Sequence, residues 1–269
     1  MRIAVAADVE TVDPLLANSR AERLVARQIY EPLVSLQAGP FEQTRRLPGV
    51  VRSLRPRRDG TLWIARLRPG IEFGDGERLD ADAVKANAAR WIEVEPGPQL
   101  VPELAFVDSP RPGIVRFFLE RPQPRFDRAL ARAELGLIAP RAIATADGGE
   151  VRRQQAGAGP FELRGHEGGT VLLARNASWW GSPLGLGPGV DQIEVLGDEG
   201  VALRVEQLES GLVQVADAIE PTAIDDNPAL TSVPGAGADA VIGVERSVRG
   251  ISTTAAAQSL ADVWLTDLR

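Results

Sequence analysis

The sequence predicts a mixed α/β protein of one large domain or two smaller ones. Short apolar runs of strand length alternate along the chain with stretches of helical periodicity. The 269 residues are 44% hydrophobic and 25% charged, which is enough apolar material for a sizeable core. The same composition excludes a disordered, collagen-like or fibrous chain.

The first elements alternate between strand and helix. Residues 3–7 are a short apolar run that predicts a buried first strand. Residues 21–30 have their apolar side chains on one side of a helix, and Pro32 ends that helix. Residues 33–36 are again strand-like.

The next hundred residues predict a hairpin, a helix and further strands. Asp59 and Gly60 are a hairpin signal that precedes a strand over 62–67. Asp80 can cap a helix over 81–91, whose apolar positions follow helical spacing. The elements expected after it are a strand over 114–119 and a short helix over 125–133.

The composition shifts toward glycine, alanine and glutamine between residues 147 and 160, which indicates a segment that crosses between two packed units. The strands expected beyond it cover 161–163, 171–175, 193–196 and 213–216. Asp198 can cap a helix that carries one apolar stripe, formed by Val201, Val205, Leu208 and Leu212. Beyond Asn227 the pattern weakens, and a final helix is expected after residues 255–257.

Charge and rare residue types narrow the chemistry. A net charge of −7 argues against a general nucleic-acid binder, so we expect no nucleic-acid partner. The absence of cysteine excludes disulfides, thiolate nucleophiles and cysteine-based metal sites. A single histidine, His166, excludes any multi-histidine metal site. We therefore predict no metal site, no cofactor and no catalytic residues.

A series of motifs follows in a recognisable order. Residues 67–84 read leucine-arginine-proline-glycine, then an apolar residue, phenylalanine-glycine-aspartate-glycine, and a helix opened by Asp80. The segments that agree with the same pattern are 11–14, 30–34, 157–163, 175–181, 190–193 and 208–216. Together these segments resemble the family 5 solute-binding proteins of ABC importers, the oligopeptide, dipeptide and nickel-type binding proteins. Gln214 departs from the pattern, because the family has an acidic residue there.

The resemblance implies a fold and a division into domains. It implies a periplasmic-binding-protein-like type II lobe with an inserted α+β subdomain, whereas family members close two lobes around a ligand. Residues 1–36 and 155–250 would form a discontinuous first lobe, and 37–154 the insert. Residues 251–269 resemble the beginning of a second lobe, which the sequence lacks.

The resemblance also implies a ligand-binding surface. The loop after Pro14 faces the ligand in the family, so Leu16, Asn18 and Ser19 are candidates. The alternative for each is an ordinary polar surface loop.

Two further segments supply candidates. Arg132 could clamp a carboxylate, with Glu134 beside it, or the two could form an ordinary exposed ion pair. Gly159, in the segment 157–159, could bring a backbone N–H close to a ligand, or the segment could be a hinge.

Other conspicuous residues are expected to be structural. Trp179 and Trp180 could stack on a ligand, but packing between subdomains is the favoured interpretation. His166 is expected to be exposed in a hairpin turn. The paired carboxylates at Asp80–Asp82 and Asp225–Asp226 are explained by helix capping and by solvated turns.

The function that the resemblance implies is binding, not catalysis. The chain would be the first lobe of the peptide- or solute-binding component of an ABC importer, with the permease as a partner. The location would be extracytoplasmic, or cytoplasmic if the N-terminus is native, because no signal peptide is visible in the sequence. The face left by the missing lobe could support a homodimer. The alternatives are a stand-alone homologue reused for partner binding or catalysis in a cytoplasmic pathway, and a fragment of a longer chain.

Overall fold

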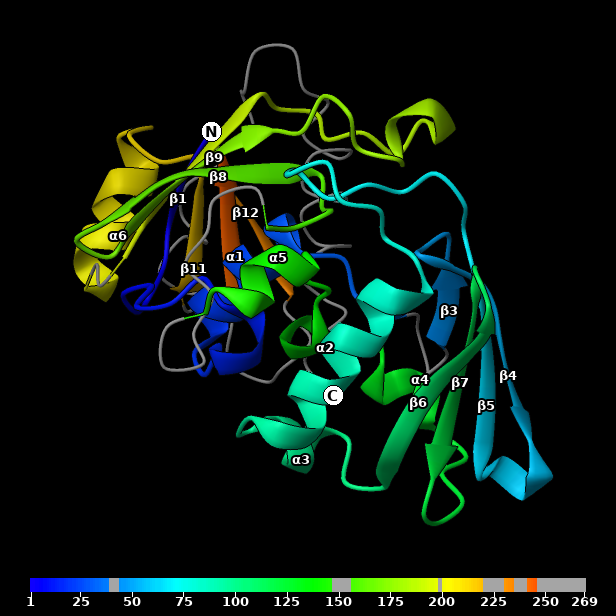
Figure 1. The fold of residues 1–269 in the computed structure, drawn as a ribbon. Coiled ribbons are helices and arrows are strands. Elements are labelled where there is room, and N and C mark those ends of the chain that lie inside the picture. Colours follow the sequence, from blue (N-terminus) through cyan, green and yellow to red (C-terminus); the bar gives the residue numbers. More distant parts are fainter. Residues whose placement is uncertain (39–43, 147–155, 198–199, 220–229, 235–240, 246–269) are drawn as a thin grey trace.

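Two sheets, one of seven strands and one of four, form opposite ends of the protein in the computed structural model (Figure 1). The structure describes residues 1–38, 44–146, 156–197, 200–219, 230–234 and 241–245. The predicted mixed α/β class is confirmed. The predicted final helix and the segment 251–269 lie outside the described residues.

The N-terminal strand lies inside the seven-stranded sheet. In spatial order the strands are β12 (Leu230–Pro234), β13 (Val241–Glu245), β11 (Val215–Ile219), β1 (Arg2–Ala4), β10 (Gln192–Leu196), β9 (Thr170–Arg175) and β8 (Phe161–Glu167). β1 is parallel to both neighbours, and the other pairs are antiparallel. β1 is shorter than the predicted 3–7, although the Val5 N–H still donates to Leu196 O (2.9 Å). Asp8 then packs between Gly169 and Gly197.

The helix α1 (Arg20–Ile29) follows the prediction, whereas α6 (Val201–Glu209) departs from it. The N-cap of α6 is Gly200, so the predicted Asp198 cap is wrong. The predicted stripe is also wrong in part, because Val201 is 52% and Leu212 49% exposed, while Leu208 is buried.

Arg204 explains why the inner face of α6 differs from the predicted apolar stripe. Its buried side chain donates to the carbonyl oxygens of Asp217 (2.9 Å) and Ala218 (3.0 Å), where β11 has a bulge. These carbonyl groups lack a regular ladder partner, so a guanidinium on the inner face of α6 satisfies them.

The four-stranded sheet is antiparallel throughout. In spatial order its strands are β4 (Val51–Arg57), β5 (Leu62–Leu67), β7 (Ile114–Leu119) and β6 (Leu104–Arg111). The predicted hairpin at Asp59 and Gly60 is confirmed, and both residues have positive φ, 58° and 91°. A separate two-stranded sheet pairs β2 (Ser35–Ala38) with β3 (Thr44–Leu47), so the predicted strand 33–36 begins two residues later.

One long helix, α2 (Ala81–Glu93), and several short ones complete the described structure. Asp80 caps α2 as predicted, and its carboxylate accepts from the N–H groups of Asp82 and Ala83. The short helices are η1 (Pro14–Leu16), η3 (Arg58–Gly60), α3 (Gly97–Leu100), α4 (Phe126–Ala129), η4 (Ala133–Leu135), α5 (Pro140–Ala144) and η5 (Ser182–Leu184). The predicted helix over 125–133 is therefore two short helices with a break between them. No helix among the described residues is long and apolar enough to cross a bilayer.

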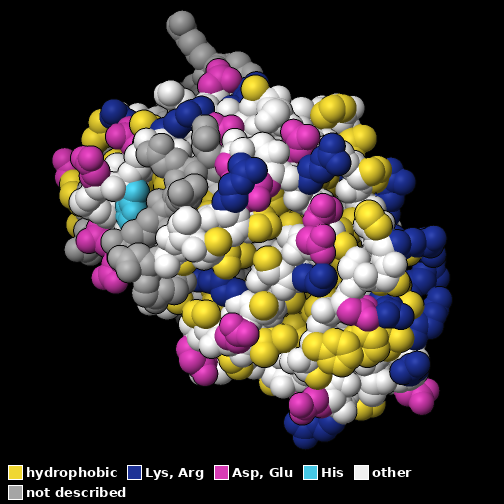
Figure 2. Space-filling model, viewed as in Figure 1, with side chains coloured by type: hydrophobic (Ala, Val, Ile, Leu, Met, Phe, Trp, Pro, Cys, Tyr) yellow, Lys and Arg dark blue, Asp and Glu magenta, His cyan; other side chains and the backbone are white. Residues whose placement is uncertain are grey.

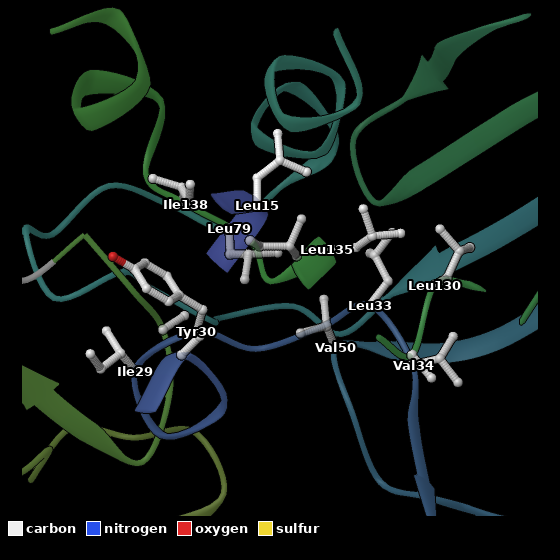
Figure 3. Close-up of a cluster of buried hydrophobic side chains, with 14 of the residues drawn as sticks. Leu15, Ile29, Tyr30, Leu33, Val34, Val50, Leu79, Leu130, Leu135 and Ile138 are labelled. Carbon is white, nitrogen blue, oxygen red and sulfur yellow. The ribbon is translucent and has the colours of Figure 1, made fainter. Parts of the chain in front are cut away.

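A single hydrophobic cluster joins the two sheets. It runs from Ile3 and Val5 of the seven-stranded side to Trp63 and Phe117 of the four-stranded side. Figure 3 shows its middle, where Leu15 of η1, Ile29 of α1, Leu135 of η4 and Leu130, the residue after α4, converge. The division of the chain at residues 36 and 155 stays a prediction.

The glycines at 157 and 159 let the chain cross the end of α1. A Cβ at Gly157 would overlap the carbonyl oxygen of Ile29, and one at Gly159 would lie 2.5 Å from that of Gln28. The N–H of Gly159 donates to Ile29 O (2.9 Å), so the close approach satisfies a carbonyl group at the helix end.

We expect Gly157→Ala to lower the free energy of unfolding by about 2–4 kcal/mol, because the added methyl must displace the α1 terminus. Gly189→Ala is the matched control, since a Cβ there meets nothing within 4 Å. Urea denaturation of both variants measures the difference. Equal stability of the two would contradict the described crossing.

Candidate ligand-binding face

The loop between β1 and α1 is held in place by the carboxylate of Glu22. This carboxylate accepts four backbone N–H groups, those of Glu10 (3.2 Å), Thr11 (3.2 Å), Asn18 (2.8 Å) and Ser19 (2.9 Å). Burial alone would raise the pKa of Glu22, but these backbone hydrogen bonds hold it below its ordinary value. One ionised side chain in the first turn of α1 therefore joins the middle of the loop, at residues 10–11, to its C-terminal end, at residues 18–19.

A buried ion pair fixes the middle of the same loop. Arg90 of α2 donates to Asp13 Oδ2 at 2.6 Å, and both side chains are almost completely buried. The other oxygen of Asp13 accepts the N–H of Leu15 (3.0 Å) at the start of η1. The pKa of Tyr30 is raised above its ordinary value by burial and by the nearby Asp13 carboxylate, and the Arg90 charge offsets only part of this rise. The pair thus ties η1 to a helix more than seventy residues away in the sequence.

The segment around η4 packs directly against η1 and α1. Gly136 allows this contact, because a Cβ there would lie 2.7 Å from the Cβ of Tyr30 and 3.3 Å from that of Pro14. Asn87 of α2 then pairs with the backbone of Ile138, accepting its N–H (2.9 Å) and donating to its carbonyl oxygen (2.8 Å). The two distant segments that carry five of the six predicted candidates therefore lie against each other, and we call them together the η1–η4 face (residues 14–19 and 132–136).

The predicted residues of this face differ in what their side chains already do. Asn18 is exposed and Leu16 is partly exposed. The Ser19 hydroxyl accepts the N–H of Glu22 and closes a capping box at the start of α1. Arg132 donates to Glu134 at 2.6 Å; its side chain is 46% exposed, and that of Glu134 is buried. The pair is therefore an exposed guanidinium anchored on a buried carboxylate.

Gly159 has a structural role at the C-terminal end of α1. It packs there about 15 Å from Ser19, which caps the N-terminal end of that 10-residue helix, whereas Gly136 of the η1–η4 face packs on the neighbouring Tyr30. The N–H of Gly159 donates to Ile29, and its carbonyl oxygen accepts from Asn176 Nδ2 (3.0 Å). Both backbone groups already have internal partners, which is the geometry of a packed crossing.

Trp179 and Trp180 pack between elements, as the favoured interpretation predicted. The indole N–H of Trp179 donates to Glu31 Oε1 at 2.8 Å, and the two rings lie 5.5 Å apart. The guanidinium of Arg68 lies over the Trp180 ring at 4.8 Å. Burial raises the pKa of Glu31 to about 7, although Trp179 and Arg27 act to lower it.

The prediction of an exposed His166 is wrong. Its Nε2 lies 2.6 Å from the carbonyl oxygen of Val9, and the side chain is partly buried. The reason is that the β8–β9 hairpin folds over the loop that follows β1, where Gly169 contacts Asp8.

The chemistry of the η1–η4 face suits recognition of polar groups. Among the described residues, no three histidine or acidic side chains gather where they could hold a metal ion. Asp13 and Glu22 already accept backbone N–H groups or an ion pair within the fold. The exposed polar groups that remain are the Asn18 side chain and the Arg132 guanidinium, which can bind an amide or a carboxylate.

The comparison with protein families identifies the chain. Residues 46–244 match the family described as "Bacterial extracellular solute-binding proteins, family 5 Middle". The chain belongs to this family of solute-binding proteins.

This family 5 protein is similar in sequence to two curated relatives. It is 26% identical over 226 residues to the probable D,D-dipeptide-binding periplasmic protein DdpA of Escherichia coli (strain K12), covering 81% of this chain and 43% of DdpA. It is 28% identical over 222 residues to the glutathione-binding protein GsiB of the same strain, covering 80% of this chain and 41% of GsiB. The chain thus spans less than half the length of these relatives.

Solved structures share the fold. The binding protein AgaA from A. tumefaciens R10, in complex with agropinic acid, superposes with a TM-score of 0.77 at 20% identity, covering 88% of this chain and 48% of AgaA. DppA from Helicobacter pylori, in complex with the peptide STSA, gives 0.74 at 18% identity, covering 88% of this chain and 50% of DppA. The periplasmic-binding-protein-like fold is therefore confirmed, and it matches about half of each solved chain.

Breaking the buried ion pair of this family 5 protein should be costly. We expect Asp13→Asn to lower the free energy of unfolding by about 3–5 kcal/mol, because it leaves the Arg90 charge buried without its carboxylate. The double variant Asp13→Asn with Arg90→Met should lose less than the sum of the two single changes, as a double-mutant cycle in urea would measure. Asp191→Asn, in the exposed pair with Arg175, is the control and should change little. Additive single changes would contradict the coupling.

Glu31 should make stability depend on pH. Its pKa is about 7 in the folded protein and 4.5 ordinarily, so the folded state holds the proton more tightly. The free energy of unfolding should therefore fall by about 3 kcal/mol as the pH rises from 4.5 to 7. Glu31→Gln, whose amide oxygen can still accept from Trp179, should remove this dependence, while the exposed-site control Glu93→Gln retains it. Thermal unfolding at several pH values tests this; identical profiles for Glu31→Gln and the parent would contradict it.

Proposed function

We propose that the chain is part of the solute-binding component of an ABC importer and binds a small polar solute or peptide on the η1–η4 face. The family match over residues 46–244 is the observation that carries the proposal. The names of the relatives, a D,D-dipeptide-binding and a glutathione-binding protein, both indicate short peptide-like ligands. AgaA and DppA were solved with a small acid and a peptide.

The proposed contacts divide by chemistry. Arg132 would bind a ligand carboxylate, because its guanidinium is half exposed and oriented by the buried Glu134. Asn18 would pair with a ligand amide, and Leu16 would supply apolar contact. Ser19 and Glu134 would act by holding their neighbours, since both already have internal partners. Gly159 would act at most through the chain crossing that it permits.

We further propose that the chain binds its solute without changing it chemically. The relatives are named as binding proteins, and the acidic groups near the η1–η4 face have structural partners. A reaction would require an acid, a base or an electrostatic device aimed at a transition state, beyond binding alone. Turnover of a peptide that disappears in Arg132→Ala or Glu134→Gln would favour catalysis instead.

Location and partners follow from the same proposal. An extracytoplasmic location agrees with the name of DdpA, a periplasmic protein, and an ABC permease would receive the solute. The homodimer and the first-lobe-only organisation stay predictions.

The proposal predicts specific binding with Arg132 as an anchor. Dipeptides and glutathione, added in millimolar amounts to the isotope-labelled chain, should shift the backbone amide resonances of Leu16, Asn18 and Arg132. Weak affinity is expected, because the tested chain spans less than half the length of the relatives that it matches. Arg132→Ala should weaken binding about tenfold or more for ligands with a free carboxylate, since a charge-assisted pair is lost.

The matched control is Arg128→Ala, an exposed arginine four residues earlier in α4. It should leave the titration unchanged. Shifts confined to other parts of the described chain, or equal affinity of Arg132→Ala and Arg128→Ala, would contradict the η1–η4 face as the binding surface.

A further inference from the structure

The side of the four-stranded sheet that faces away from the core carries an unusual set of residues. Strand alternation places Leu54, Trp63, Ala65, Val115 and Phe117 inward, where they are buried. The cross-strand register then places a second set on the outer face: Arg55 and Arg57 of β4, Ile64 and Arg66 of β5, Phe106 and Asp108 of β6, and Ile114, Arg116 and Phe118 of β7. Arg111 is exposed at the end of β6. We call this set, with Arg111, the outer face.

The outer face is basic although the protein is acidic. It holds five arginines and one carboxylate in a chain whose net charge is −7. Arg116 pairs with Asp108. Among the described residues, the other four arginines lie within salt-bridge distance of no carboxylate, and Arg55, Arg57, Arg66 and Arg111 are all exposed. Figure 2 shows Lys and Arg side chains gathered along the right-hand edge of the molecule, where Figure 1 places β4 and β5.

Two phenylalanines lie beside these arginines. Phe106 and Phe118 stack with their ring centroids 4.3 Å apart and an interplanar angle of 9°. Phe106 is 52% exposed, which is high for a large apolar side chain on a sheet strand. The guanidinium of Arg116 lies 5.5 Å from the centre of the Phe118 ring, so one flank of the aromatic pair is already cationic.

We propose that the outer face docks on the surface of a bilayer that contains anionic phospholipids. Guanidiniums spread over four strands, about 14 Å from first to last, can each meet a separate phosphate group. Electrostatic attraction to such a surface adds up over the basic residues near it. The exposed phenylalanine pair supplies apolar surface at the depth of the headgroups. The net negative charge of the whole chain orients this face toward the lipid, because the remaining surface is repelled.

Protection of the sheet edge and recognition of an acidic protein each account for less of this surface. Arginine and proline on an edge strand discourage unwanted strand pairing, which explains Arg55, Pro56 and Arg57 on β4. Edge protection leaves Arg66 of a central strand and the exposed Phe106 unaccounted for. A specific acidic protein partner needs about 800 Å² on each side, whereas the backbone of this sheet face spans only about 14 by 20 Å.

The test is co-sedimentation of the 269-residue chain with lipid vesicles. Vesicles of phosphatidylcholine with roughly 30% phosphatidylglycerol are the probe, and pure phosphatidylcholine vesicles are the reference. The chain should bind only the anionic vesicles, and added salt should weaken binding. Arg55→Gln with Arg57→Gln should weaken it roughly 30-fold, about fivefold for each arginine. Phe106→Ser should reduce the binding that persists at high salt.

The control removes the same charge from a different surface. Arg125 precedes α4 and Arg128 lies within it. Phe126 of this helix packs on Trp63 and Phe117, so α4 lies on the inward side of the sheet. Arg125→Gln with Arg128→Gln should leave vesicle binding unchanged. Equal loss in both double variants, equal binding to neutral vesicles, or binding to polyglutamate without binding to vesicles would overturn the proposal. The η1–η4 face is not altered in either variant, so solute titrations remain a separate readout.

Discussion

The buried pair of Asp13 and Arg90 is the contact on which the geometry of the η1–η4 face depends. It joins the loop after the central strand to α2, two parts of the chain that share no sheet. A buried ion pair is weak evidence for stability, because desolvation opposes the attraction of the charges. The pair also has a positional effect, because Asp13 bonds both Arg90 of α2 and the N–H of Leu15 in η1 and so joins the two elements at this point. Glu22 and Asn87 then fix the neighbouring backbone, because their side-chain oxygens accept backbone N–H groups.

The local parts of the fold could be predicted from the sequence. The Asp80 cap and the Asp59–Gly60 turn depend on residues within a few positions, so their signals are complete in short windows. The stripe of α6 could not be predicted, because Arg204 turns inward to satisfy carbonyl groups at a bulge in β11. The spacing of apolar residues around Arg204 does not reveal that the carbonyl group of Asp217, thirteen residues later, needs a hydrogen-bond donor.

The same division holds for the candidate site. The spacing of Ser19 and Glu22 is a capping-box signature that is visible in the sequence alone. The partnership of Asp13 with Arg90 spans 77 positions, and neither residue type nor spacing reveals it. The pKa of Glu31 is raised by burial, and its hydrogen-bond partner Trp179 lies 148 positions away, so the sequence alone reveals neither.

The η1–η4 face separates the residues that build the frame from those free to meet a ligand. Ser19 and Glu22 bond to backbone groups, and Asp13 bonds to Arg90, so changing them would alter the loop itself. Asn18 projects its side chain from a backbone fixed by Glu22, and Arg132 rests on a buried carboxylate. In the proposed function, such a frame would hold the recognition groups before ligand arrives, which would reduce the entropy lost on binding. Under the same proposal, specificity would change through Asn18 and Arg132 without loss of the fold.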